Sequence, residues 1–376
     1  MKIVLFPSAY YPSLGGVEEL TNKIALQLVN CGHYVKIFTA LMPNTKKKDI
    51  HAELDIYRFR FKLPARKVID TLVFLFLFPV EMFRILLIVK RFKADIIHIQ
   101  CASSNTLYAV VASKLLRVPL VLTSQGETRM DAGKIYKKSA FMRKILVYGL
   151  KQASYVTACS KATLDDLCKN YFDVSLKSKV VFNGIDSKEF GGDVQSIEDT
   201  YIFATGRLSS NKGFDLLIRA FQSLPDKYKD VSLFIGGSGE QEQELRELIA
   251  DLKLGGRVRL LGRLNRMDTV KYMKNSLFVT MTSRYEPFGI VATEGLAAGK
   301  AVMVTKHGGP PEFINDREQG LVIDPFNDDL YVEKLVDMLE SYEKYQQGNY
   351  EYVSNYFNWS IIVESYLDIY RLVGNK

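Results

Sequence analysis

The chain repeats one order of elements twice, and this repeat limits its possible folds more than any other feature. Near the start, an apolar strand, KIVLF, precedes a loop ending in GGVEE and a helical stretch, LTNKIALQLVNCG. After residue 200 the order returns as YIFATG, RLSSNKG and FDLLIRAFQSL, and further apolar strands alternate with helical stretches in both halves. This alternation is typical of parallel sheets covered on both faces. The sequence therefore predicts an α/β protein with two facing Rossmann-like domains.

The length agrees with two domains, because one domain commonly takes roughly 100–200 residues and the chain has 376. A stretch rich in glycine and acidic residues, NGIDSKEFGGDVQSIEDT, separates the two halves. We expect an N-terminal domain over residues 1–182 and a C-terminal domain over residues 183–350. The last segment, residues 351–376, is amphipathic and is expected to form a helix that returns to the N-terminal domain.

The loops that follow strands carry the candidate site residues, because ligands of open α/β sheets bind at the carboxyl ends of the strands. We expect these loops to line a cleft between the two domains. The loop GRLSSNKGF places Arg207 and Lys212 between a strand and a helix, where two cations and a helix N-terminus could hold a diphosphate. Gly15 and Gly16 would allow close backbone approach from the other domain.

The segment SRYEPFGIVATEGLAAG combines two carboxylates with the start of a helix. Pro287 and Gly289 predict a tight turn, followed by a helix over residues 290–298. Glu286 precedes the helix and Glu294 lies inside it. The first free N–H groups of such a helix form an anion site. A carboxylate beside that site suits binding of a sugar hydroxyl. The alternative is that Glu286 is simply a charge on a loop and Glu294 a solvated helix residue.

Several other chemistries lack their sequence signals. The chain has no complete G-x-x-x-x-G-K-[ST] or G-x-G-x-x-G pattern, so ATPase and nicotinamide-dependent functions lose their main support. It has no D-x-D, so a metal-bridged diphosphate is not indicated and two protein cations would replace the metal. We therefore expect no metal and no cofactor.

The cysteines and histidines indicate structural rather than metal-binding roles. Four cysteines lie in apolar patterns without a C-x-x-C pair, so we expect buried, reduced thiols in a cytoplasmic protein. His33 and His98 lie beside predicted strands and are expected to be structural. His307, which precedes GGPPE, is a candidate for lining the cleft.

The basic residues concentrate in the first half of the chain. Residues 1–185 hold 28 Lys and Arg against 13 Asp and Glu, whereas residues 186–376 hold 22 against 29. Such asymmetry suggests that the first half faces an anionic surface, and no nucleic-acid motif is visible. Basic residues interleave with apolar groups at 46–48, 58–62, 91–93 and 134–146. This mixture suits the headgroup region of an anionic bilayer, and a solvated basic face is the alternative.

One apolar segment, TLVFLFLFPVEMFRILLIVKRF at residues 71–92, is the main membrane candidate. Pro79, Glu81 and Arg84 interrupt it, whereas a spanning helix needs about 20 consecutive apolar residues. The sequence therefore predicts a buried helix or one that lies on a membrane surface. The N-terminus has only a short apolar run before Pro7 and is expected to form the first strand rather than a signal peptide.

Six segments, taken together, resemble the glycosyltransferases of family 4, which have the GT-B fold. These segments are GGVEE, NGID, GRLSSNKG, GGSGEQEQEL, YEPFGIVATEGLAAG and HGGPPEFI. They occur in the family's order over nearly the whole chain. The resemblance implies that a sugar moves from a nucleotide-sugar donor to an acceptor, with retention of the anomeric configuration and without a metal.

The resemblance also assigns roles to individual residues. It implies that Arg207 and Lys212 hold the donor diphosphate, that Glu286 binds hydroxyls of the donor sugar, and that Glu294 binds the ribose. The other donor-binding positions that it implies lie in the glycine-rich loops, beside the base and at the start of the helix after Glu286: Gly15, Gly16, Gly237, Arg263, Leu264, Phe288, Gly289, Ile290 and Val291.

One position departs from the family pattern. Many members carry a histidine after the strand that matches PLVLTS, where this chain has Gln125. A glutamine can hydrogen-bond the reacting groups but cannot titrate. This difference suits a mechanism in which the leaving phosphate takes the acceptor proton, and it also allows an inactive homologue. Glu127 and Asp131, just downstream, either contact the acceptor or are surface charges.

The leading hypothesis is a retaining, metal-independent glycosyltransferase that uses a nucleotide-sugar, with a UDP-sugar favoured. Its acceptor would be a glycan or a lipid-linked molecule in cell-envelope polysaccharide or lipopolysaccharide synthesis, at the cytoplasmic face of the membrane. One alternative is a soluble transferase with a small-molecule acceptor. Another is a nucleotide-sugar-binding subunit without catalysis. No nucleic-acid partner is expected.

Overall fold

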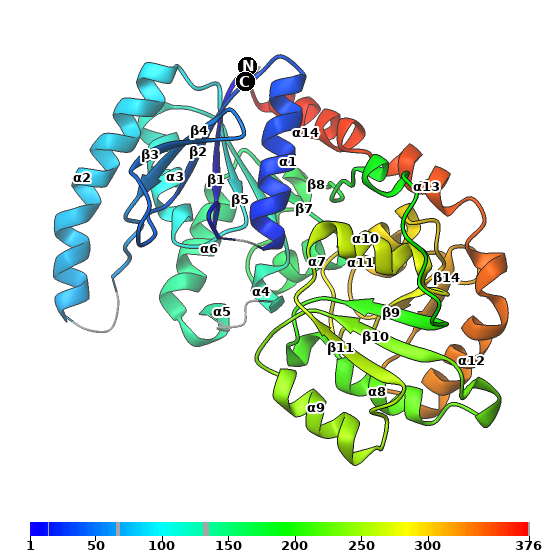
Figure 1. Cartoon of the computed structure of the whole chain (residues 1–376). Helices are drawn as coiled ribbons and strands as arrows, with labels where there is room; N and C mark the ends of the chain where they lie inside the picture. The colour runs from blue at the N-terminus through cyan, green and yellow to red at the C-terminus, as the bar shows by residue number, and fades with distance from the viewer. Residues whose placement is uncertain (14, 65–67, 131–134, 375–376) are drawn as a thin grey trace. The chain divides into compact units, whose positions relative to one another are not determined.

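The computed structural model describes residues 1–13, 15–64, 68–130 and 135–374, and the chain divides into two compact units (Figure 1). Unit 1 comprises Met1–Asn183 and Trp359–Lys376, and unit 2 comprises Gly184–Asn358. The first boundary lies one residue from the expected position. The second differs from the expectation, because residues 351–358 belong to unit 2 and the returning segment begins at Trp359.

Unit 1 is built on an eight-stranded sheet with the order β3-β4-β2-β1-β5-β6-β7-β8. All of its neighbouring strands pair in parallel, apart from β3 and β4, which are antiparallel. The central strands are almost continuously apolar and buried, as expected for a sheet covered on both faces. Its strands are β1 (Lys2–Pro7), β2 (Tyr34–Ala40), β3 (Lys48–His51), β4 (Leu54–Phe59), β5 (Ile96–Gln100), β6 (Leu120–Ser124), β7 (Tyr155–Ala158) and β8 (Ser178–Val180).

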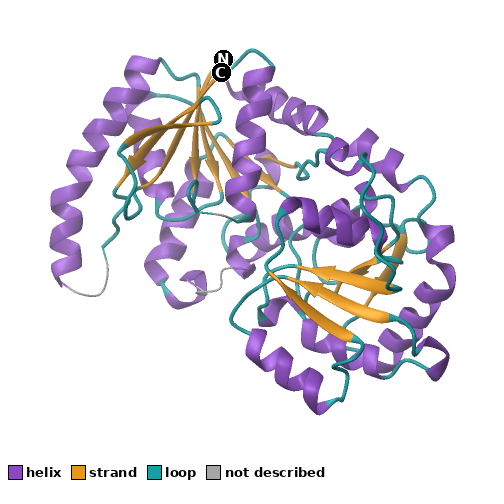
Figure 2. Ribbon diagram, in the orientation of Figure 1, coloured by secondary structure: helices purple, strands orange, loops and turns teal. Residues whose placement is uncertain are grey.

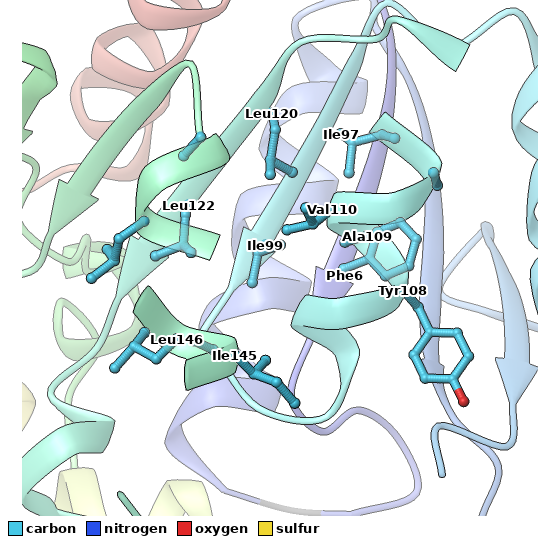
Figure 3. Close-up of a cluster of buried hydrophobic side chains, with 14 of the residues drawn as sticks. Phe6, Ile97, Ile99, Tyr108, Ala109, Val110, Leu120, Leu122, Ile145 and Leu146 are labelled. Carbon is cyan, nitrogen blue, oxygen red and sulfur yellow. The ribbon is translucent and has the colours of Figure 1, made fainter. Parts of the chain in front are cut away.

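Helices cover both faces of this sheet (Figure 2). They are α1 (Gly16–Asn30), α2 (Val68–Phe92), α3 (Asn105–Leu116), α4 (Glu127–Met130), α5 (Ile135–Lys138), α6 (Ala140–Gln152), α7 (Lys161–Asn170) and α14 (Trp359–Gly374), with a 3₁₀ turn at Ser175–Lys177. In the core, Val110 of α3 and Leu146 of α6 lie against the strand residues Ile99 and Leu122 (Figure 3). This packing fixes the carboxyl ends of β5 and β6, which carry the candidate residues of unit 1.

The last helix, α14, is bound to unit 1 by a buried polar contact. Nδ1 of His98 on β5 lies 2.5 Å from the hydroxyl of Tyr370, and its Nε2 lies 2.6 Å from the hydroxyl of Thr123. Complete burial lowers the pKa of His98 to about 3, so the imidazole is neutral at physiological pH. His98 is therefore a structural residue, as expected from its place on a strand.

Unit 2 is built on a six-stranded parallel sheet with the order β11-β10-β9-β12-β13-β14. Its strands are β9 (Tyr201–Thr205), β10 (Ser232–Gly236), β11 (Val258–Gly262), β12 (Val279–Met281), β13 (Val302–Thr305) and β14 (Gly320–Ile323). Its helices are α8 (Phe214–Gln222), α9 (Glu242–Asp251), α10 (Arg266–Asn275), α11 (Ile290–Ala297), α12 (Asp328–Tyr345) and α13 (Asn349–Tyr356). Short 3₁₀ turns lie at Ser187–Phe190, Ser210–Lys212, Asp226–Tyr228 and Pro310–Glu312.

Several expectations from the sequence need correction. The first helix begins at Gly16 instead of after GGVEE, so Gly15 is its N-cap. Arg58, expected in a surface basic cluster, is only 2% exposed on β4. All four cysteines were expected to be buried, but Cys31 is exposed and Cys168 is only partly buried.

The helix α2 is less buried than expected for a core helix. By length and composition, Thr71–Phe92 is apolar enough to cross a membrane, and only 22% of that window is buried inside the protein. The expectation of a buried helix is therefore wrong. Large apolar side chains of α2 are exposed: Ile69, Leu72, Val73, Leu75, Phe76, Val80, Phe83 and Leu87.

Candidate active site

Two turns at the carboxyl ends of neighbouring strands in unit 2 are joined side by side. One connects β9 to α8 and the other connects β12 to α11. The Nη1 and Nη2 atoms of Arg284 donate to the carboxylate of Asp215, at 2.8 and 2.7 Å. The side-chain amide of Asn211 donates to the carbonyl of Tyr285 at 3.1 Å. These contacts hold the Lys212 turn and the Glu286 turn in one arrangement.

The central contact of this pair of turns is the ion pair between Lys212 and Glu286. The Nζ atom of Lys212 lies 2.6 Å from Oε2 of Glu286, and the hydroxyl of Ser283 donates to the same oxygen at 2.9 Å. The Glu286 residue is only 7% exposed. An ammonium has three donors, so Lys212 can hold Glu286 and still donate to a ligand.

The backbone of Glu286 is fixed by the loop that follows β13. Its N–H donates to the carbonyl of His307, and its carbonyl accepts from the N–H of Gly309, both at 2.9 Å. A Cβ atom on Gly308 would lie 1.9 Å from the Glu286 carbonyl oxygen, and the φ of Gly308 is +121°. Only glycine fits there, so HGG in the sequence positions the carboxylate.

The side chain of His307 points to a different partner. Its Nε2 lies 2.9 Å from Oδ1 of Asp324, and its ring lies against Phe326. Hydrogen bonding from Lys306, with a smaller contribution from His307, lowers the pKa of Asp324 to about 2. His307 therefore supports Glu286 through its backbone carbonyl.

Arg207 lies on the same turn as Lys212 but pairs with another carboxylate. Its Nε lies 3.1 Å from Oε2 of Glu240, and both side chains are exposed. The pKa of Glu240 is lowered, first by a hydrogen bond from its own backbone and second by Arg207. In this structure, the two predicted diphosphate-binding cations are thus held by separate carboxylates.

The start of α11 provides the backbone groups that the sequence predicted. The N-cap is Gly289, with a φ of +108°, and the first intrahelical bond is donated by the N–H of Ala292. The amides of Ile290 and Val291 precede that bond, so they are the free donors of a helix N-terminus. The ring of Phe288 packs into the core against Phe313, and only its backbone is positioned for a ligand.

Glu294 belongs to a cluster that the sequence analysis missed. Arg266, the first residue of α10, binds Glu294 through Nη1 and Glu189 through Nε, the latter at 2.7 Å. Burial lowers the pKa of Arg266, but the carboxylates of Glu294 and Glu189 outweigh that effect and raise it. The guanidinium also lies over the ring of Phe190. Arg266 thereby fixes Glu294, the expected ribose ligand.

The positions expected beside the base meet at the ends of β10 and β11. The N–H of Gly237 donates to the carbonyl of Gly262 at 2.8 Å. A Cβ atom on Gly237 would lie 1.8 Å from the carbonyl oxygen of Gly206, and one on Gly236 would lie 2.6 Å from Leu264. Arg263 is exposed. The glycine loop, Leu264 and Arg263 thus share one edge of the unit 2 sheet.

In unit 1, Glu127 joins the loops after β5 and β6. Its carboxylate accepts from the N–H of Ala102 at 3.0 Å, the hydroxyl of Ser124 at 2.9 Å and the N–H of Gln125 at 2.8 Å. Burial raises the pKa of Glu127, and these donors oppose that effect. Glu127 is therefore buried rather than a surface charge, and it also lines a cavity of about 370 Å³. Its contact with an acceptor stays a prediction. Asp131 lies outside the described residues.

The side-chain amide of Gln125 is only partly hydrogen-bonded among the described residues. Its Oε1 accepts from Nδ2 of Asn183 at 3.0 Å. Its Nε2 is buried and, over the residues that the structure describes, has no hydrogen-bond partner. The residue Gln125 lines the same cavity of about 370 Å³ at the carboxyl ends of β5 and β6. An unsatisfied buried donor costs about 1–3 kcal/mol, so Gln125 is a candidate to turn this amide toward a ligand oxygen in the cavity.

The glycine pair after β1 lies beside a buried carboxylate. A Cβ atom on Gly15 would lie 2.7 Å from Oε2 of Glu18, and the hydroxyl of Ser13 donates to Oε1 of Glu18 at 2.7 Å. Gly16 has open space at its Cβ position. A Cβ atom at position 15 would displace only the end of the Glu18 side chain, and the φ of Gly15 is −171°, so the packing in this structure requires glycine at neither position.

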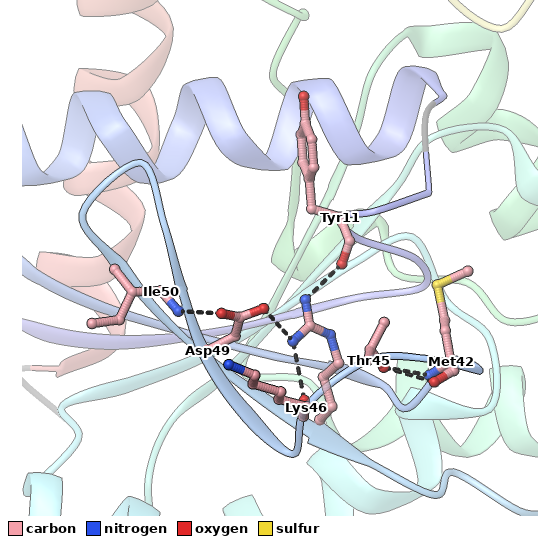
Figure 4. A network of polar contacts seen from close by, with 7 residues as sticks. Tyr11, Met42, Thr45, Lys46, Asp49 and Ile50 are labelled. Carbon is pink, nitrogen blue, oxygen red and sulfur yellow. Dashed lines mark hydrogen bonds and ion pairs between the residues drawn. The ribbon is translucent and has the colours of Figure 1, made fainter.

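Arg58, which was expected at the surface, contacts the loop between β1 and Gly15. Its guanidinium donates to the carbonyl of Tyr11 at 2.9 Å and to the carbonyl of Lys46 at 3.1 Å, and it pairs with Asp49 at 3.2 Å (Figure 4). Arg58 therefore links strand β4 to the loop that leads into Gly15.

Among the described residues, no group of three or more His, Cys, Asp or Glu side chains is arranged to hold a metal ion. In unit 2, the described candidate groups are the side chains of Lys212, Arg207, Glu286 and Glu294 and the amides at the start of α11. Unit 1 separately provides Gln125 and Glu127. These groups suit the hydroxyls and phosphates of a nucleotide-sugar.

Two parallel-sheet units with these strand-end turns define the class of glycosyltransferases with the GT-B fold that use nucleotide-sugar donors. Residues 14–189 match the family model described as Glycosyltransferase Family 4, and residues 192–351 match the model described as Glycosyl transferases group 1. The chain therefore belongs to the group 1 and family 4 glycosyltransferases.

Two relatives and one solved structure are similar to this chain. The chain is 27% identical to an uncharacterised glycosyltransferase of Methanocaldococcus jannaschii, over 99% of this chain and 98% of the relative. It is 34% identical to the N-acetylgalactosamine-N,N′-diacetylbacillosaminyl-diphospho-undecaprenol 4-alpha-N-acetylgalactosaminyltransferase of Campylobacter jejuni, over 55% and 57% of the two chains. The structure of HepE from Anabaena in complex with UDP superposes with a TM-score of 0.77 at 20% identity, covering 98% and 99%.

Proposed function

We propose that the protein transfers a sugar from a UDP-sugar, with retention and without a metal, to a lipid-diphosphate-linked acceptor in cell-envelope glycan synthesis. The observation that carries the proposal is the ion pair between the partly buried Lys212 and the buried Glu286, beside the free amides of α11. The Campylobacter relative, whose name includes diphospho-undecaprenol, supports the acceptor class. HepE, which binds UDP, supports the donor class.

The residues of unit 2 bind and polarise the donor in this proposal. Lys212 and Arg207 donate to the diphosphate, and the amides of Ile290 and Val291 take its oxygens. Glu286 accepts from a hydroxyl of the transferred sugar, and Glu294, held by Arg266, accepts from the ribose. Two cations and a helix start together stabilise the negative charge that develops on the leaving diphosphate.

In the transfer step, no side chain of the protein has to accept or release a proton. The bond between the sugar C1 and the diphosphate oxygen breaks, and a bond between C1 and the acceptor oxygen forms on the same face of the sugar. The acceptor hydroxyl gives its proton to the leaving diphosphate oxygen. In unit 1, Gln125 donates a hydrogen bond to an oxygen of the acceptor, a role that suits a residue that cannot titrate.

Peripheral association with the cytoplasmic face of the membrane is part of the proposal. Two features of unit 1 support it: its excess of basic residues and the exposed apolar side chains of α2. A helix that presents large apolar groups beside basic residues binds at the headgroup boundary of anionic bilayers. The basic clusters at residues 46–48 and 91–93 carry exposed lysines and arginines.

The test is a transfer assay with a UDP-sugar and a polyprenyl-diphosphate-linked sugar in EDTA-containing buffer. We expect release of UDP together with a lipid-linked product. We also expect the NMR coupling constant of the new anomeric proton to show the configuration of the donor. An inverted product, or turnover that EDTA abolishes and Mg²⁺ restores, would contradict the mechanism. Transfer to a free sugar alone would contradict the acceptor class.

A further inference from the structure

Two cavities in unit 1 adjoin at the carboxyl end of its sheet. The smaller, of about 370 Å³, contains Gln125 and Ser8. The larger, of about 800 Å³, lies between the chain after β4 and the start of α6. They share three lining residues, Ser103, Ile135 and Met142. Because both volumes fall in the range of small-molecule sites, roughly 300–1,000 Å³, one extended ligand could occupy them together.

The larger cavity combines an apolar wall with positive charge. Phe61, Leu63 and Phe141 line it, and so do Lys62 and Lys138. Among the described residues, neither of these two ammonium groups has a carboxylate partner. Most lysines on protein surfaces are solvated, but two in the wall of one apolar cavity provide charge for an anionic group that is attached to an apolar chain.

The smaller cavity has a different character. The buried Nε2 of Gln125 lacks a partner over the described residues, and the hydroxyl-bearing Ser8 and Ser103 also line the cavity. Tyr136 of α5, whose hydroxyl donates to the carbonyl of Ala102 at 2.6 Å, fixes the wall that it shares with Ile135. This end therefore suits a sugar, since sugars present hydroxyl oxygens to donors of this kind.

We propose that the two cavities form one acceptor site for a sugar linked through diphosphate to an isoprenoid chain. The first isoprene units occupy the larger cavity, the diphosphate binds Lys62 and Lys138, and the sugar lies against Gln125 in the smaller cavity. The order of apolar wall, lysines and polar end matches the order of chain, diphosphate and sugar in such an acceptor. This inference rests on the proposed function and specifies how its acceptor is recognised.

The charge on the cavity favours this occupant over a neutral glycolipid. A glycolipid without phosphate would leave both ammonium groups without a counter-charge, and a free sugar would leave the apolar wall exposed to water. Pro64, which lines the larger cavity, lies four residues before the start of α2 at Val68. The proposed membrane helix therefore follows directly in the chain from the proposed lipid-binding wall.

Farnesyl diphosphate is a soluble probe for this site. Its affinity is measured by calorimetry on the full chain with saturating UDP, so that the donor site of unit 2 is occupied. We expect the Lys62→Gln/Lys138→Gln variant to bind at least tenfold more weakly than the wild type. The matched control, Lys169→Gln/Lys179→Gln, changes the net charge equally with exposed lysines of unit 1 that line neither cavity, and it should bind within twofold of the wild type.

A second variant tests the apolar wall. Leu63→Asp should weaken farnesyl diphosphate at least tenfold, and farnesol and inorganic diphosphate should each bind the wild type at least tenfold more weakly than the probe. Equal losses in the lysine variant and its control, or farnesol binding as tightly as farnesyl diphosphate, would overturn the inference. UDP binding in the same samples separates the claims: if UDP binds and the probe does not, this inference fails and the donor part of the proposed function stands.

Discussion

At the residue scale, the most specific prediction about donor binding concerns Glu286. Glu286→Gln keeps the shape of the side chain but removes the charge that pairs with Lys212 at 2.6 Å. We expect transfer to fall roughly 100-fold, the size of a lost transition-state contact, with the nucleotide itself still bound. The measurement is the turnover rate with UDP-sugar, alongside the Kd for UDP. Unchanged turnover would remove Glu286 from the reaction.

The pair formed by Arg284 and Asp215 is expected to act on the site through position alone. Burial raises the pKa of Asp215, but the bidentate contact from Arg284 outweighs it and leaves the pKa below its ordinary value. In a double-mutant cycle with Arg284→Gln and Asp215→Asn, we expect a coupling energy of about 1 kcal/mol in urea unfolding. A coupling of zero would show that the pair does not tie the two turns together.

At the element scale, α2 should carry the membrane contact. Phe76 and Phe83 are 75% and 68% exposed, and burying apolar area is worth about 25 cal/mol per Å². Phe76→Ser/Phe83→Ser should therefore reduce sedimentation with anionic vesicles about tenfold or more. The control is Leu176→Ser, which removes an exposed apolar side chain of unit 1 outside α2. Equal losses in both variants would argue against a specific role for α2.

The attachment of α14 to unit 1 should depend on pH through His98. The pKa of His98 in the folded state, about 3, lies below its unfolded value near 6.5. On acidification the unfolded state binds the proton first, so this contribution is complete above about pH 6.5 and is lost as the pH falls toward 3. Over this range, the contribution of His98 to the free energy of unfolding changes by up to about 1.4 kcal/mol per pH unit. In urea unfolding between pH 6.5 and 4.5, His98→Gln should show a shallower slope than the wild type; an identical slope would contradict this.

At the scale of the whole molecule, local patterns predicted much of the fold and part of the site. The apolar strands, the turn at Gly289 and the helix after it follow from neighbouring residues, and they form as expected. Arg284 contacts Asp215 from 69 residues away, and Arg266 contacts Glu294 from 28 residues away. Only the sheet topology brings such partners together, so neither contact could be read from sequence spacing.

The burial of Arg58 and the exposure of α2 show a second limit. The segment RFRFK, residues 58–62, predicted a basic surface. Alternate residues of a strand point to opposite faces, and Arg58 on β4 points inward. The apolar run of α2 predicted either a buried helix or one on a membrane surface, and much of it is exposed. Composition alone does not say which face of an element is covered, and that depends on the neighbouring elements.

The most direct test of the central claim is calorimetric titration of the protein with UDP, GDP and ADP in the presence of EDTA. The account predicts that UDP binds, that EDTA does not change its Kd, and that Lys212→Gln weakens it about tenfold or more, because an ammonium–phosphate contact is worth roughly 1.5–3 kcal/mol. Lys227→Gln, which removes an exposed lysine of unit 2 paired with Glu340, should leave the Kd unchanged. If none of the three nucleotides binds, or if UDP binds only with a divalent metal, the account of the donor site is wrong.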